Sequence, residues 1–137
     1  MVSVSEIIKF IKHETLIEMR EDSDIWRRGT VGDDFAELME AYAKQFGVEM
    51  NGYRWYFHHE DEGWNLGGLF FKPPNRRVKR IPVTPKMLAS FANQGRWSID
   101  YPEHHIPKKR VDILFNQLCA GAILLLMIWF LISKYGQ

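Results

Sequence analysis

The fold is decided by residues 111–137, which read VDILFNQLCAGAILLLMIWFLISKYGQ. No charged residue occurs between positions 113 and 133. A helix over these positions would be roughly 31 Å long, which matches the hydrocarbon thickness of a bilayer. We therefore predict one C-terminal transmembrane helix over residues 111–133, followed by a short tail over residues 134–137.

A buried core helix of a soluble protein is the alternative for this stretch. Residues 118–132 would be apolar on every side of a helix, whereas a helix at the surface of a globular core keeps one polar side. This uniform run favours the membrane. Asn116 and Gln117 lie about one turn inside the basic flank, where they could reach interfacial water or hydrogen-bond to a neighbouring helix. The sequence leaves both possibilities open.

The charged flanks of this segment predict its direction. Lys108, Lys109 and Arg110 precede it, and Lys134 alone follows it. Because Lys and Arg are retained on the cytoplasmic side, we expect the N-terminal part to face the cytoplasm. The first twelve residues contain an acid and two lysines, which does not fit the apolar core of a signal peptide. Nothing in this sequence is expected to export the N-terminal part.

Composition divides the rest of the chain into two oppositely charged blocks. Residues 1–62 carry 7 Lys/Arg against 14 Asp/Glu, and residues 63–110 carry 10 against 2. The blocks could form an acidic and a basic face, or could attract each other inside one domain. About 100 residues suffice for one small core, so we predict one domain over residues 1–100 and a proline-bounded basic linker over 101–110. The single Cys119 excludes a disulfide scaffold and a Cys-based zinc site.

Two helices of the domain carry clear boundary signals. Ser3 and Glu6 fit a capping box, in which each side chain bonds to the other residue's amide. Thr84 and Pro85 fit the cap and first position of another helix, which Gly95 should stop. The apolar residues expected on the core sides are Ile7, Ile8, Ile11 and Leu16 for the first helix, and Leu88, Phe91 and Ala92 for the other, with Trp97 behind it.

The strongest helical pattern covers residues 30–47. Thr30 can cap its start, and Gly47 is the expected left-handed stop. The apolar residues that recur at helical spacing are Phe35, Leu38, Met39, Tyr42 and Phe46. The other side would be acidic through Asp33, Asp34, Glu37 and Glu40.

The segments between these helices are less regular. Residues 53–57 (YRWYF) and 69–71 (LFF) could be a short hairpin or irregular packing segments, because periodicity cannot separate the two in runs so short. Residues 72–80 (KPPNRRVKR) predict an exposed basic loop. Ile25 and Trp26 are expected to plug a charged loop onto the core. The fold class is therefore mainly α, a small helical domain possibly with a short hairpin, plus one C-terminal transmembrane helix.

Residues 31–38 (VGDDFAEL), continued by Ala41, Phe46 and Glu49, resemble the second helix of acyl carrier proteins. Together with residues 84–88 (TPKML) and 95–97 (GRW), they make residues 3–98 similar to DUF1493, an acyl-carrier-like family of enterobacterial proteins of unknown function. The resemblance implies an acyl-carrier-like helical fold and places the chain at the bacterial inner membrane. It does not cover the membrane segment.

The resemblance carries over only in part. Asp34, Glu37, Leu38, Ala41 and Phe46 match a carrier's recognition helix, whose acidic side docks on basic patches of partner enzymes. The serine that carriers modify falls on Gly32, which has no hydroxyl group to hold a phosphopantetheine arm. The resemblance thus implies a carrier-shaped binding module with no cofactor. A functional acyl carrier, or an accessory subunit of a lipid-handling enzyme, is the alternative.

Other chemistries have weaker signals. His58-His59 and His104-His105 lie beside acids, but adjacent side chains on an extended chain point to opposite sides. We therefore expect exposed loop histidines and no metal site. The basic loop and its aromatic neighbours could bind single-stranded nucleic acid, but an anionic leaflet would be nearer, and we expect no nucleic-acid partner.

We accordingly predict a non-enzymatic protein of the inner membrane with a protein partner. The partner-binding residues are predicted to be Asp33, Asp34, Glu37 and Glu40. The cations predicted to lie at the membrane surface are Lys72, Arg76, Arg77, Lys79, Arg80, Lys108, Lys109 and Arg110.

Overall fold

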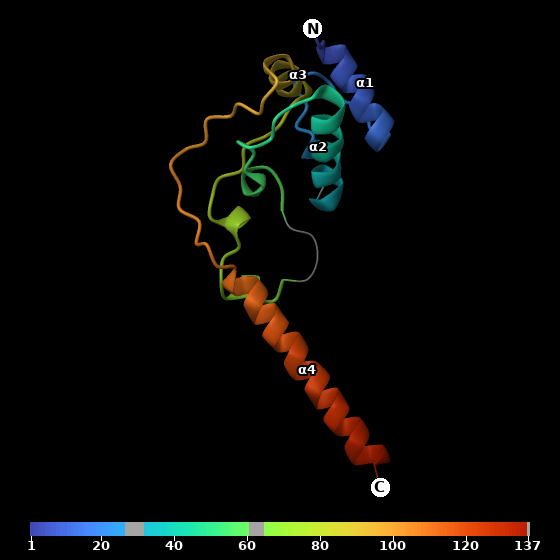
Figure 1. Ribbon diagram of the computed structural model, residues 1–137, viewed down its shortest axis with the longest axis vertical. Helices are drawn as coiled ribbons and strands as arrows, with labels where there is room; N and C mark the ends of the chain where they lie inside the picture. Colours follow the sequence, from blue (N-terminus) through green and yellow to red (C-terminus); the bar gives the residue numbers. More distant parts are fainter. Residues whose placement is uncertain (27–31, 61–64, 137) are drawn as a thin grey trace.

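The first three α-helices of the chain gather at one end of the molecule, and the last one extends away from them (Figure 1). The computed structural model describes residues 1–26, 32–60 and 65–136, without the side chain of Asp33. The helices are α1 (Val4–Thr15), α2 (Gly32–Phe46), α3 (Pro85–Gln94) and α4 (Val111–Tyr135), with short 3-10 turns η2 (Trp55–Phe57), η3 (Gly67–Leu69) and η4 (Pro74–Arg76). The predicted mainly helical class is confirmed.

Helix α1 begins at the predicted capping box. The Glu6 amide donates to the Ser3 hydroxyl over 3.2 Å, and the Ser3 amide donates to the Glu6 carboxylate over 2.6 Å. Ile7 and Ile11 are fully buried as expected, and Phe10 is buried beside them. The core position predicted for Leu16 is wrong. Leu16 ends the helix in the left-handed conformation at φ 60° and is 86% exposed.

Helix α2 buries its predicted apolar side against α1 and α3. Phe35, Leu38, Met39 and Tyr42 are buried, and the Tyr42 hydroxyl donates to the Leu88 carbonyl oxygen over 2.5 Å. The helix ends before Gly47, whose φ of 65° suits a residue without a Cβ. The expected cap Thr30 lies outside the described residues.

Helix α3 confirms its predicted start and stop. The Thr84 hydroxyl accepts from the Met87 amide over 3.2 Å, Pro85 lies in the first turn, and Gly95 follows at φ 73°. Leu88, Phe91 and Trp97 join the core. The predicted plug is also confirmed, because Ile25 is fully buried and its amide donates to Val83 over 3.0 Å.

The segment between α2 and α3 is irregular rather than a hairpin. Over the part of the segment that the structure describes, η2 covers the end of the first aromatic run, and Leu69 of the second run ends η3. The isolated parallel bridge of the described residues pairs Glu49 with Arg96, which follows α3. The Glu49 amide donates to Gly95 over 2.9 Å, and the Trp97 amide donates to Glu49 over 2.8 Å. Of the two arrangements left open by the sequence, packing segments are the one observed.

Helix α4 is not a core helix of this domain. It is 25 residues long, its most apolar window has a mean hydropathy of 2.1, and none of that window is buried. Its length and composition suffice to cross a membrane. Residues 101–110 run without regular structure along the outside of the molecule to the start of α4 (Figure 1).

Candidate membrane-proximal site

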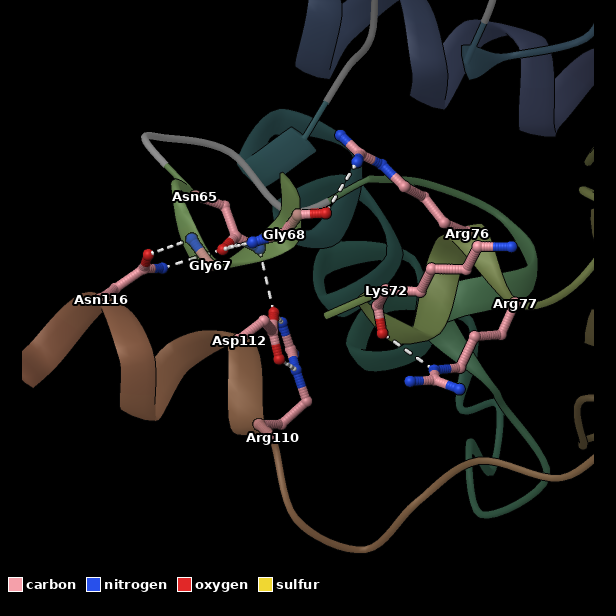
Figure 2. A network of polar contacts seen from close by, with 9 residues as sticks. All are labelled: Asn65, Gly67, Gly68, Lys72, Arg76, Arg77, Arg110, Asp112 and Asn116. Atoms are coloured by element: carbon pink, nitrogen blue, oxygen red, sulfur yellow. Dashed lines mark hydrogen bonds and ion pairs between the residues drawn. The ribbon is translucent and has the colours of Figure 1, made fainter. Parts of the chain in front are cut away.

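The turn η3 is hydrogen-bonded to the first two turns of α4, and Asn65 is the centre of this contact (Figure 2). Its amide nitrogen Nδ2 donates to Asp112 Oδ2 over 2.9 Å. Its oxygen Oδ1 accepts from Asn116 Nδ2 over 2.8 Å and from the Gly68 amide over 2.9 Å. One side chain thereby connects η3 to two successive turns of α4. We call this set of contacts the junction.

Gly67 brings the two backbones of the junction into direct contact. Its amide donates to Asn116 Oδ1 over 2.6 Å. A Cβ added to Gly67 would lie 2.1 Å from the carbonyl oxygen of Asp112, which no packed structure accommodates. Glycine is therefore required here for space. The side-chain amide of Asn116 hydrogen-bonds to Gly67 and Asn65. The sequence suggested interfacial water or a neighbouring helix as its partner instead.

Asp112 is the charged member of the junction and is only 2% exposed. Arg110 neutralises it through two bonds, Nε to Oδ1 over 3.0 Å and Nη2 to Oδ2 over 2.7 Å. A carboxylate in the first turn also interacts favourably with the positive end of the helix dipole. Arg110, predicted as a cation at the membrane surface, thus also holds Asp112 in place.

Beside the junction lies a group of exposed apolar side chains, which we call the apolar edge: Leu66, Leu69, Phe70 and Phe71. Leu69 and Phe70 are 72% and 68% exposed. The rings of Phe70 and Phe71 lie 5.3 Å and 6.1 Å from the ring of Phe115, in the second turn of α4. The apolar edge therefore continues the apolar surface of α4 onto the domain.

The predicted basic loop follows the apolar edge directly. Lys72, Arg76, Arg77 and Lys79 are exposed. Arg77 Nε donates to the Lys72 carbonyl over 2.8 Å within the loop, and Arg76 Nη1 donates to the Gly68 carbonyl of η3 over 3.2 Å (Figure 2). These four cations lie beside exposed apolar side chains, which is the composition of a surface that meets lipid headgroups.

The remaining predicted cations differ in their surroundings. Lys108 and Lys109 are exposed just before α4. Arg80 is partly buried, forms an ion pair with Asp24 and lies 5.0 Å above the ring of Trp26. Arg80 therefore ties two segments of the domain together, and it is the least accessible to a membrane of the cations in residues 72–80.

Helix α2, which carries the acidic side chains, belongs to the helical end of the molecule, and α4 extends away from that end (Figure 1). Asp34, Glu37 and Glu40 are exposed, and the structure gives them no cation partner among the described residues. We call these three residues the acidic face. The side chain of Asp33, predicted with them, lies outside the description, and Gly32 begins the helix.

The expectation that the histidines are exposed is wrong for His58 and His59. His58 is fully buried, with Nδ1 donating to the Ile81 carbonyl over 2.9 Å and Nε2 accepting from the Tyr101 hydroxyl over 2.7 Å. Burial lowers the pKa of His58 to about 4. Because the Tyr101 hydroxyl also accepts from Trp97 Nε1 over 2.8 Å, this cluster pins the linker to the core.

The second histidine pair, His104-His105, lies on the surface. His104 is exposed and lies 2.9 Å from the Tyr56 hydroxyl, and His105 is exposed. Within residues 1–26, 32–60 and 65–136, no three His, Cys, Asp or Glu side chains gather as a metal site would require.

Sequence reasoning found the acidic face and the basic loop but missed the junction and the apolar edge. The available signal was the pair Gly67-Gly68 directly before the run LFF. Paired glycines indicate a close backbone approach, but nothing in the sequence identifies Asp112 and Asn116 as the groups approached.

Comparison with known proteins gives a family but no function. A family model described as protein of unknown function (DUF1493) matches residues 4–100. No curated protein and no solved structure gives a significant match. The match covers more than half of the chain and ends before the linker and α4. The chain belongs to the DUF1493 family.

Proposed function

We propose that this member of the DUF1493 family is a membrane-anchored, non-catalytic protein that presents the acidic face of α2 to a protein partner at the bacterial inner membrane. The observation that carries the proposal is the junction. Bonds from Asn65 and Gly67 to Asp112 and Asn116 fix the domain on α4. The acidic face would therefore be held at a constant distance from the bilayer.

The apolar edge and the basic loop support contact with the leaflet. Phe70 and Phe71 lie against Phe115, which is one turn inside α4. If α4 spans the membrane, their rings lie at the same depth in the leaflet as its first turns. Each Lys or Arg held at an anionic surface contributes roughly 1 kcal/mol. The exposed cations Lys72, Arg76, Arg77 and Lys79 therefore favour an orientation in which this loop touches the headgroups.

Charge distribution supports the same orientation. The acidic block of residues 1–62 includes α2, and the basic block of residues 63–110 includes the loop beside α4. An anionic leaflet attracts the basic end and repels the acidic end. The positive-inside rule places the three cations before α4 on the cytoplasmic side of the membrane. The acidic face would consequently point into the cytoplasm.

Helix stability does not explain the acidic face. Asp34, Glu37 and Glu40 are spaced three residues apart, so they are neighbours on one side of α2. Like charges about one turn apart oppose a helix by roughly 0.2–0.5 kcal/mol. A partner with a basic surface would neutralise them, and we infer such a partner rather than a lipid or a nucleic acid.

Site-specific cross-linking in intact membranes tests this proposal. A photo-reactive phenylalanine analogue replaces Glu37 on the acidic face, and in a matched control it replaces Ser90, an exposed residue of α3. We expect discrete cross-linked partner bands from position 37 and none of the same bands from position 90. Equal or absent cross-linking at the two positions would contradict the proposal.

A further inference from the structure

A pocket of about 530 Å³ opens between α2 and the aromatic segment that follows it. Helix α2 contributes Met39, Glu40 and Ala43, and the facing wall includes Tyr53, Trp55 and His59. Small-molecule sites are typically apolar clefts of roughly 300–1,000 Å³ with a few polar groups. The pocket has this size and this composition.

Two residues that line the pocket each carry a buried polar atom without a partner among the described residues. His59 Nε2 and the Tyr53 hydroxyl are buried, and neither makes a hydrogen bond within the described residues. His59 is only 8% exposed. Buried polar groups in native proteins are nearly always hydrogen-bonded, so these two atoms indicate that the pocket receives a polar group from outside the chain.

The proton positions of these groups define what they can bind. His59 Nδ1 lies 3.2 Å from the Glu60 carbonyl oxygen, so it carries the proton and leaves Nε2 as an acceptor. Burial raises the pKa of Tyr53, so its hydroxyl stays protonated at neutral pH and can donate. Two residues of this wall thus hold an unpaired acceptor and an unpaired donor.

Both rings are held in place by their neighbours. The Tyr53 ring stacks on His58 at 5.4 Å and meets the edge of Trp97 at 5.0 Å. The His59 ring lies 5.4 Å from Phe35 and 5.5 Å from Trp55. Neither side chain can turn to water without disturbing the core, so the unsatisfied atoms are fixed features of the wall.

We propose that this pocket binds a small neutral amphipathic molecule. Its apolar body would lie against Met39, Ala43 and Trp55, and its polar end, an amide or a hydroxyl group, would donate to His59 Nε2 and accept from Tyr53. The exposed Glu40 at the rim disfavours an anionic ligand. This inference uses neither the junction nor the partner. It shares only Glu40 with the acidic face, and its test measures binding of the amides without any partner.

Methyl NMR of the full chain in lipid nanodiscs tests the pocket. The chain has six methionines, of which Met39 and Met50 line the pocket, Met19 is in the core and Met127 is in α4. The probe is 4-phenylbutanamide, which is neutral and carries both a donor and an acceptor. We expect saturable shifts of the Met39 and Met50 methyl signals without a saturable shift of Met19.

The matched control probe is N,N-dimethyl-4-phenylbutanamide, which has no N–H group. Loss of one hydrogen bond to a buried acceptor should weaken binding by about tenfold. His59→Phe keeps a ring but removes the acceptor, so it should weaken the primary amide about as much and leave the dimethyl amide unchanged. If the Met19 signal reports that His59→Phe does not fold, Tyr53→Phe is the second variant. Both amides keep the carbonyl oxygen that accepts from Tyr53, so Tyr53→Phe should weaken the binding of both amides by about tenfold.

Three results would overturn the proposal. The first is no saturable shift at Met39 and Met50. The second is equal affinity for the two amides, or unchanged affinity in the folded variants. The third is a non-saturating response that parallels Met127, which would mean partition into lipid only.

Discussion

Gly67 is the residue whose side-chain volume limits the junction most directly. The Cβ of Gly67→Ala would lie 2.1 Å from the Asp112 carbonyl oxygen, so η3 must move away from α4 and the bonds of Asn65 to Asp112 and Asn116 must lengthen. We expect the amides of residues 67–71 to exchange with solvent at least about tenfold faster, while the amides of α2 keep their rates.

Gly121→Ala is the matched control for this substitution. A Cβ at Gly121 would meet nothing within 4 Å, so its exchange pattern should equal that of the parent. Unchanged exchange of residues 67–71 in Gly67→Ala would show that the junction does not need the close contact.

His58 makes the stability of the domain depend on pH. Its pKa is about 4 in the folded chain and 6.5 in the unfolded chain. Between these values the unfolded chain binds a proton that the folded chain does not. The contribution of His58 to the free energy of unfolding is therefore full above pH 6.5 and is lost as the pH drops toward 4, by up to about 3 kcal/mol.

The variant His58→Gln isolates this effect. Its amide can donate to Ile81 and accept from Tyr101, as His58 does, but it does not titrate. Tryptophan fluorescence during denaturant unfolding in micelles should show a smaller loss of stability between pH 7 and pH 5 in the variant than in the parent. An equal loss would exclude His58 as the cause.

Single residues also differ in how far their structural role could be predicted from the sequence. Gly47 and Gly95 were predicted, because a helix stop is a local event marked in the adjoining residues. The burial of His58 was not, because its partners Ile81 and Tyr101 are distant in sequence. Gly67 is similar, since it faces Asp112.

Among the elements, the acidic face makes the sharpest prediction. Reversing Glu37 and Glu40 to Lys should leave the circular dichroism and membrane insertion unchanged, because both side chains are exposed. Any co-purifying partner should be lost, and its binding to the parent should weaken as salt rises.

The control reversal is Glu14→Lys with Glu21→Lys, at exposed positions in α1 and the loop after it. It changes the net charge by the same amount and should keep the partner. If the α2 reversal also keeps every partner at unchanged affinity, the acidic face is only solvated surface.

Element boundaries that neighbouring residues set could be predicted from the sequence, whereas elements shaped by contacts with distant residues could not. The start of α1 and both ends of α3 were predicted because capping groups adjoin them. Leu16 was misassigned because it continues the apolar spacing of α1, although the chain turns left-handed there. The turns η2 and η3 carry no period, since their form depends on packing against distant residues.

For the whole molecule, the first prediction is the direction of α4. Three cations precede it and Lys134 follows, so the positive-inside rule predicts a cytoplasmic domain. An alkaline phosphatase fusion at the C-terminus should be active in a bacterial host, and one at the N-terminus silent. The reverse activities would invert the orientation, and release of the protein by carbonate would contradict the anchor.

The contact of the apolar edge with the leaflet is the central claim, and spin-label depth measures it most directly. After replacement of Cys119, the single cysteine of the chain, a label is attached at Leu69 or at Glu40 in liposomes with anionic lipid. We predict that the label at 69 is more accessible to oxygen than to a water-soluble nickel complex, and that the label at 40 shows the opposite. Equal water accessibility at both positions would contradict the account.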